Sequence, residues 1–243
     1  MVSLFSMYSG GRKEGKEIKV RSLAPLLAIP EAVGRCAEMG RPLVYTTGIS
    51  GTISRASGAA ILAGIGILGY TTRECAKQGV KVKLFSTTVD AAPLLEETIK
   101  TAYTAEGHPE MYSPDMIELI ANQSSMVSRY LGWIAREKPA SACLLGYLAY
   151  ESVVLSEGGN TIGALQISGT TNSYQIPFLV ASTDYCLIIE ELYAASAKIS
   201  GDYYSLGVLA GEDILKFILV GLMVLGMLLA AGGSKVLIDL LGK

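Results

Sequence analysis

Residues 42–54 read PLVYTTGISGTIS, an apolar run that passes directly into a loop of glycine and hydroxyl residues. An apolar run of this length, with β-branched and aromatic side chains, predicts a buried strand. The uncharged stretch that follows predicts a long helix over about 56–78, which ends at Gly79. A strand, a small loop and a helix in this order are the opening unit of an α/β fold.

The same alternation continues in both directions from this unit. Further strands are predicted at residues 80–88, 116–122, 140–147, 163–168 and 177–183, and helices at 26–39, 91–106, 124–137, 150–157 and 190–199. Asp90 is the expected N-cap of the helix that begins at residue 91. We therefore expect a three-layer, Rossmann-like α/β domain with a largely parallel sheet over residues 23–210.

The composition agrees with a sheet that is covered on both faces. Half of the residues are hydrophobic, only 17% are charged, and the mean hydropathy is +0.40. A parallel sheet buried on both faces would account for much of this excess, and a subunit interface for part of it. The net charge of −2 gives no general attraction to nucleic acid, so a nucleic-acid partner is not expected.

The C-terminal part contains the longest strongly apolar stretch without a charge, FILVGLMVLGMLLAAGGS at residues 217–234. As a helix it would be about 27 Å long, close to the roughly 30 Å hydrocarbon core of a bilayer. We expect a transmembrane anchor at 211–234 and a short tail at 235–243. Its lipid-facing side chains would include Phe217, Ile218, Leu219, Val220, Leu222, Met223, Leu225 and Leu228.

The opening residues MVSLFSMYS are too few, and lack the basic flank, for a secretory signal. We therefore expect a single-pass membrane protein with its globular domain in the cytoplasm. A second span at residues 56–72, ASGAAILAGIGILGYTT, is the alternative, although its four glycines weaken it. Such glycines also allow a crossover helix to lie close to a sheet.

A basic arm at residues 1–22 precedes the domain. Residues 12–21 contain five cations and two glutamates, which gives a local net charge of +3. The arm is a candidate contact with anionic lipid headgroups or with a neighbouring copy, and the alternative is a solvated strand or loop. Its cations are Arg12, Lys13, Lys16, Lys19 and Arg21.

Neither a metal nor a cofactor is indicated. The four cysteines are scattered without a Cys-x-x-Cys pair, and the single histidine, His108, lies in a polar loop. Glu190 and Glu191 fit the start of a helix. Glu151 stands beside an apolar run, where a buried carboxylate needs a partner, and a helix N-terminal position is the simpler interpretation.

Several predicted strands end in small hydroxyl or acidic residues. In open α/β sheets ligands bind outside the carboxyl ends of the strands, where helix N-termini direct N–H groups at them. No Walker A or Gly-x-Gly-x-x-Gly motif is placed correctly, and capping and turns also favour these residue types. The candidate ligand-binding residues are Thr47, Gly48, Ser50, Gly51, Thr87, Gly169, Thr170 and Asp184.

Several strings in the chain resemble one family. They are EAVGRCAEMGRP, ILGYTTRECAKQG, EKPA, EGGNTIGALQISGT, QIPFLVASTDY and EELYAASA. They are similar to a family of uncharacterised prokaryotic membrane-anchored domains, described only as a domain of unknown function. The resemblance covers about residues 20–230. It implies the architecture and the anchor, with no activity, and its members often begin with a further membrane helix, which MVSLFSMYS does not provide.

Two functions are therefore expected. The first is a membrane-anchored, homo-oligomeric scaffold or assembly protein, since no intact catalytic motif is present and shared tethering raises effective concentration. The alternative is a protein or enzyme that binds a nucleotide or phosphorylated ligand at the carboxyl ends of the strands.

Overall fold

A sheet of six parallel strands forms the centre of the larger of two units, residues 21–200. The computed structural model describes residues 23–48, 52–55, 57–201 and 216–227 of the chain. The strand order is β3-β2-β1-β4-β5-β6, and every neighbouring pair is parallel, which confirms the Rossmann-like prediction. The strands are β1 (Leu43–Gly48), β2 (Val82–Ser86), β3 (Ile117–Leu119), β4 (Ser141–Tyr147), β5 (Leu165–Thr170) and β6 (Tyr185–Ile188).

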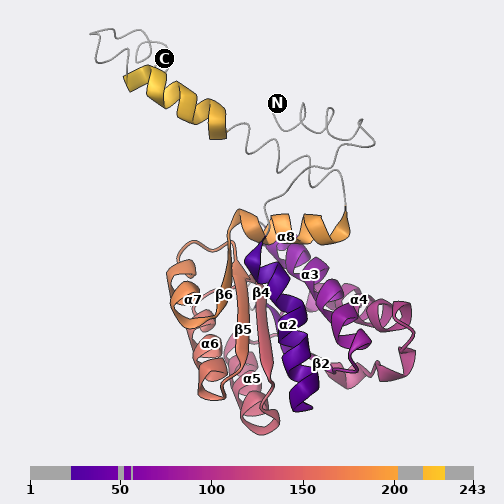
Figure 1. The fold of residues 1–243 in the computed structure, drawn as a ribbon. Helices are drawn as coiled ribbons and strands as arrows, with labels where there is room; N and C mark the ends of the chain where they lie inside the picture. Colours follow the sequence, from indigo (N-terminus) through magenta and orange to yellow (C-terminus); the bar gives the residue numbers. More distant parts are fainter. Residues whose placement is uncertain (1–22, 49–51, 56, 202–215, 228–243) are drawn as a thin grey trace. The chain divides into compact units, whose positions relative to one another are not determined.

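Helices cover both faces of this sheet, giving the three predicted layers (Figure 1). One face packs against α2 (Ala24–Met39), α3 (Gly58–Lys77), α4 (Ala92–Ala105) and α8 (Glu190–Ser200). The other face packs against α5 (Gln123–Glu137), α6 (Glu151–Thr161) and α7 (Ile176–Ser182). Three short 3-10 turns complete the unit, at Val89–Ala91, Pro109–Met111 and Pro114–Met116.

The central strands supply side chains to two separate hydrophobic clusters. Leu43 and Tyr45 of β1 join the cluster beneath α2, α3, α4 and α8, whereas Val44 between them joins the cluster beneath α5, α6 and α7. All six residues of β1 and of β5 are buried. This burial on both faces explains the high apolar fraction of the sequence.

The glycines of α3 bring this helix onto the sheet. A Cβ atom at Gly64 would lie 2.3 Å from the carbonyl oxygen of Leu145 in β4, so only glycine allows this approach. Most of the apolar residues of α3 are buried against the sheet and its neighbouring helices. The alternative of a second membrane span at residues 56–72 is therefore wrong, and the reason is the packing role that the glycines suggested.

Two local predictions are wrong. Residues 177–183 form the greater part of α7 rather than a strand, with Pro177 in the first turn of the helix. Only Leu179 of the run is buried, whereas the neighbouring Phe178 and Val180 are exposed. The sixth strand is the following segment, Tyr185–Ile188. Asp90 does not cap α4, whose N-cap is Ala91; its carboxylate accepts a hydrogen bond from the Ile53 N–H, at 2.9 Å.

The second unit is described over residues 216–227, which form a helix. All its apolar side chains are exposed, from 40% at Leu222 to 77% at Phe217. Within the described ranges no helix combines the length and the apolarity needed to cross a bilayer. Residues 211–215 and 228–234 of the expected anchor, including Leu228, lie outside the described residues. So does the whole basic arm, with Arg12, Lys13, Lys16, Lys19 and Arg21.

Candidate functional site

The carboxyl ends of β1, β2, β4 and β5 meet at one edge of the sheet. Going outward from the centre, the strand order reverses between β1 and β4, whose following helices α3 and α6 cover opposite faces. This switch point is where open α/β sheets bind their ligands. We call the residues at the ends of these four strands, and the turns that follow them, the carboxyl edge.

Two glycines set the geometry at the switch point. Gly48, with φ of 98°, ends β1, and a Cβ atom there would lie 1.9 Å from the carbonyl oxygen of Tyr147. Gly146, with φ of 153°, is placed reciprocally, 2.0 Å from the oxygen of Thr47. The register between β1 and β4 shifts at this point. The two backbones are therefore in direct contact at the end of β1.

A buried chain of hydroxyl groups lies at the ends of β1 and β2. The Thr47 and Ser86 hydroxyl oxygens are 2.9 Å apart, and the Thr88 N–H donates to the Ser86 oxygen at 3.2 Å. The Thr88 side-chain oxygen is also buried but has no hydrogen-bond partner among the described residues. A buried hydroxyl without a partner is uncommon, because its desolvation is not compensated.

The turn after β4 is held by the end of β5. The Thr170 hydroxyl oxygen accepts hydrogen bonds from the N–H groups of Leu148, at 3.1 Å, and Asn172, at 3.3 Å. The Asn172 side-chain amide donates to the Leu148 carbonyl at 3.0 Å. Thr170 is therefore a fixed part of the wall of the carboxyl edge.

Two carboxylates fix the turns around the edge. Asp90 holds the Ile53 N–H and so joins the turn after β2 to the loop after β1. Glu151, the first residue of α6, is fully buried and accepts bonds from the Ala149 N–H and the Gln123 side-chain amide, both at 2.7 Å. The helix N-terminal position predicted for Glu151 is confirmed.

The N-terminus of α3 faces the same edge without a side-chain cap. Its N-cap residue, Ser57, makes no side-chain capping bond, and the first turn consists of glycine and alanine. The Gly58 N–H donates to the Arg55 carbonyl at 2.8 Å, and the other first-turn N–H groups and the helix dipole favour an anion. A Cβ atom at Gly58 would lie 1.9 Å from the Ile53 carbonyl oxygen, so the loop before α3 packs tightly on its first turn.

The predicted ligand residues fall into three groups. Thr47, Gly48, Thr87 and Thr170 lie together at the carboxyl edge. Gly169 is also there, but its missing side chain admits Leu187 and Leu145, which is a packing role. Ser50 and Gly51 lie outside the described residues.

Asp184 is placed at the opposite edge. Because residues 177–183 are helical, Asp184 precedes β6 instead of following a strand, and its carboxylate accepts the Gln166 N–H near the start of β5, at 2.7 Å. Conversely, Gly146 and Asn172 belong to the edge but were not predicted. A glycine inside a strongly apolar strand was the available indication for Gly146.

Clustered metal ligands are not found in the part of the chain that the structure describes. Burial raises the pKa of the thiols of Cys36, Cys75 and Cys143, so these groups remain protonated near neutral pH. His108 is exposed in its loop, 3.2 Å from the Glu110 carboxylate. The described polar groups at the carboxyl edge are therefore mainly hydroxyls, backbone groups and the carboxylates of Asp90 and Glu151.

The chain belongs to the family described as domain of unknown function DUF6754, whose match covers residues 1–240. The predicted resemblance to a domain of unknown function is thereby confirmed, whereas membrane anchoring and prokaryotic origin stay predictions. No curated protein and no solved structure matches the chain.

Proposed function

We propose that the α/β unit binds a small anionic ligand, a nucleotide or phosphorylated metabolite, at the carboxyl edge between β1, β2 and β4. The observation that carries this proposal is the buried Thr88 hydroxyl, which has no partner among the described residues. It lies beside the bonded hydroxyls of Thr47 and Ser86, since the Thr88 N–H donates to the Ser86 oxygen. A ligand oxygen at this position would supply the missing bond.

The chemistry of the edge favours an anion with hydroxyl groups. First-turn N–H groups of α3 would hold a phosphate, and Thr87 and Thr88 would face the adjoining sugar or polyol. In many dinucleotide-binding domains a carboxylate after the second strand binds the ribose. Here Asp90 accepts the Ile53 N–H with one carboxylate oxygen, and the hydroxyls of Thr87 and Thr88 would bind the sugar beside it.

Thermal unfolding of the full chain in mild detergent tests this proposal. Inorganic phosphate, AMP, ATP and NAD serve as probes, and a probe that binds the folded state raises the midpoint. A free probe concentration one hundred times its Kd stabilises the folded state by about 2.7 kcal/mol. Thr88→Val should reduce the rise, whereas Thr104→Val, on the exposed side of α4, should leave it unchanged. The absence of a rise with every probe would contradict the proposal.

A second candidate function is a membrane-anchored assembly of several copies. It is favoured by the apolar helix at residues 216–227, whose exposed side chains call for lipid or protein contact. In this proposal the helix extends to residue 234 and crosses the bilayer once, with the globular unit in the cytoplasm. The basic arm would contact lipid headgroups or a neighbouring copy.

Sedimentation of the full chain in mild detergent tests the assembly. We expect a defined homo-oligomer that is weakened when residues 1–21 are removed. A monomer that persists at high protein concentration would contradict the assembly proposal, and would leave ligand binding at the carboxyl edge unaffected.

A further inference from the structure

A cavity of 560 Å³ lies at the amino edge of the sheet, opposite the carboxyl edge. It is formed where β1 and β2 begin and where α2, α3 and α5 end, and its size is that of a small-molecule site. Its apolar surface comes from Cys36, Val80, Met116 and Trp133. We call it the amino-edge cavity.

The charged lining of the amino-edge cavity has an excess of cations. Arg41, Lys81 and Lys83 line it, together with the carboxylates Asp115 and Glu137, which gives a net charge of +1. Charge alone does not make a site, so the partners of each cation decide whether any of them can bind a ligand.

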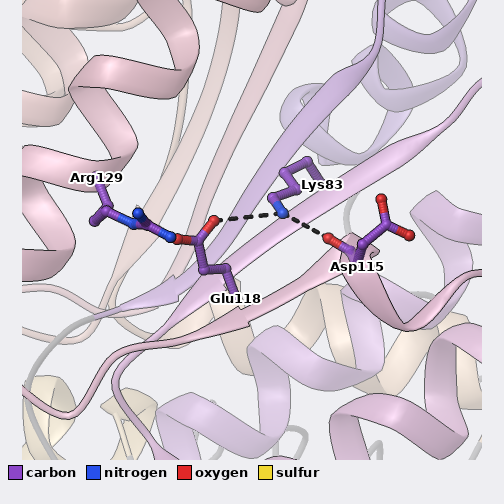
Figure 2. Close-up of polar contacts among 4 residues, drawn as sticks. All are labelled: Lys83, Asp115, Glu118 and Arg129. Carbon is purple, nitrogen blue, oxygen red and sulfur yellow. Dashed lines mark hydrogen bonds and ion pairs between the residues drawn. The ribbon is translucent and has the colours of Figure 1, made fainter.

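Lys83 is fully engaged within the protein. Its ammonium donates to the Asp115 carbonyl at 2.5 Å and lies 3.4 Å from one oxygen of Glu118 (Figure 2). The other Glu118 oxygen accepts from Arg129 of α5 at 2.6 Å. Glu118 therefore shares its charge between two cations, and Lys83 forms a fixed wall of the cavity.

Arg41 and Lys81 differ from Lys83 in their side-chain contacts. Neither side chain makes an ion pair or hydrogen bond with any residue that the structure describes. They lie at neighbouring strand starts, because the Leu43 N–H donates to the Lys81 carbonyl at 3.0 Å. Both side chains line the cavity, where the hydrogen bond from Ser113 lowers the pKa of Asp115 and the charge of Lys81 adds to this effect. An anion that reaches both cations would gain their attraction.

Helix ends do not account for these two cations. Cations often neutralise the unpaired carbonyls at helix C-termini, and α2 and α3 both end at this cavity. Both helices, however, close on a glycine in the left-handed region, Gly40 and Gly79. The carbonyls of Cys36 and Cys75 accept the N–H groups of Arg41 and Val80 at 3.0 and 2.9 Å. These helix ends are therefore satisfied by backbone groups.

We propose that the amino-edge cavity is a second ligand site, which binds a small organic anion with a flat ring. The phosphate or carboxylate lies between Arg41 and Lys81, and the ring packs against Trp133 and the apolar wall formed with Met116. Guanidinium and ammonium groups bind such anions through charge-assisted hydrogen bonds. This site is independent of the ligand proposed for the carboxyl edge.

Trp133 makes the test specific, because it is the only tryptophan in the chain. The full chain in mild detergent is titrated with AMP and, separately, with inorganic phosphate, while tryptophan fluorescence is recorded. We expect AMP to change the emission with a Kd below about 1 mM, and phosphate to bind more weakly because it has no ring.

Variants separate this site from the rest of the surface. Arg41→Gln combined with Lys81→Gln should weaken AMP binding at least tenfold, with the unliganded thermal midpoint confirming that the variant folds. Lys100→Gln, an exposed cation on α4, and Thr88→Val at the carboxyl edge should leave the fluorescence titration unchanged. The proposal is overturned if AMP leaves the Trp133 emission unchanged, if phosphate binds as tightly as AMP, or if the double variant binds as the wild type does.

Discussion

Gly48 shows how the absence of one side chain determines the candidate site. Its positive φ and its contact with Tyr147 exclude any Cβ atom, and Gly146 is constrained in the same way from the facing strand. Only with both glycines can the backbones of β1 and β4 approach this closely at the carboxyl edge.

Gly48→Ala should therefore destabilise the protein severely. The alanine would cost about 1–3 kcal/mol in backbone strain, and its Cβ atom would also overlap the Tyr147 carbonyl. We therefore expect chemical denaturation to show a free energy of unfolding lower by more than about 3 kcal/mol. Gly40→Ala is the matched control, because Gly40 also has a positive φ but no atom near its Cβ position. It should cost about 1–2 kcal/mol. Equal losses in the two variants would show that the β1–β4 contact is not tight.

The cysteines give a second prediction at the residue scale. Burial raises the pKa of the Cys36, Cys75 and Cys143 thiols, so the reactive thiolate is scarce at pH 7.5, and the three side chains are inaccessible. We expect iodoacetamide to modify none of the three in the folded protein, with slow reaction at the partly exposed Cys186. Mass spectrometry of peptides gives the modified fraction. Rapid labelling of Cys143 would contradict its place in the core.

The sequence predicts the role of a single residue only where that role depends on its neighbours along the chain. Thr47, Gly48 and Thr170 were placed at the carboxyl edge because a strand, its end and the following loop are local features. Gly169, like Gly48, is a glycine near the end of a strand, but its role is in packing. The side chains that fill the space beside it, Leu187 and Leu145, come from other strands. Such contacts between distant segments leave no local pattern.

At the scale of the element, α6 depends on the buried carboxylate at its first residue. Glu151 joins three segments, since it accepts bonds from the turn before the helix and from the first residue of α5. Removal of the carboxylate takes one acceptor from each of the half-buried Ala149 N–H and Gln123 amide groups.

Glu151→Ala should lower the free energy of unfolding by about 2–4 kcal/mol. Glu157→Ala, on the exposed surface of the same helix, should change it by less than about 0.5 kcal/mol. Urea denaturation followed by circular dichroism provides both values. A loss of similar size in both variants would mean that helix propensity, rather than the buried contacts, governs α6.

Among the elements, the buried strands were predicted most accurately and the last βαβ unit least. The apolar runs of β1, β2 and β4 are bounded by glycines and turn residues, so their type is clear. Residues 177–188 contain two apolar runs separated only by Ser182, Thr183 and Asp184. A short apolar run fits a helix or a buried strand equally well, so the first run was predicted as the strand although the second run forms it.

At the scale of the whole molecule, the anchor proposal depends on residues 217–234. Two charged substitutions in the middle of a membrane helix oppose insertion by about 2.5–3.5 kcal/mol each. Leu222→Arg combined with Leu225→Arg should therefore release the protein from membranes during alkaline extraction, whereas Leu222→Ala with Leu225→Ala should remain bound. Wild-type protein in the soluble fraction would contradict the anchor.

Native mass spectrometry of the full chain, released from mild detergent at saturating AMP, measures the ligand at the carboxyl edge. In the Arg41→Gln, Lys81→Gln double variant, which lacks the amino-edge site, each copy of the chain should still carry one AMP molecule, and adding Thr88→Val to this variant should release it. A double variant with the bare polypeptide mass, or a triple variant that carries as much AMP as the double variant, would contradict a ligand at the carboxyl edge.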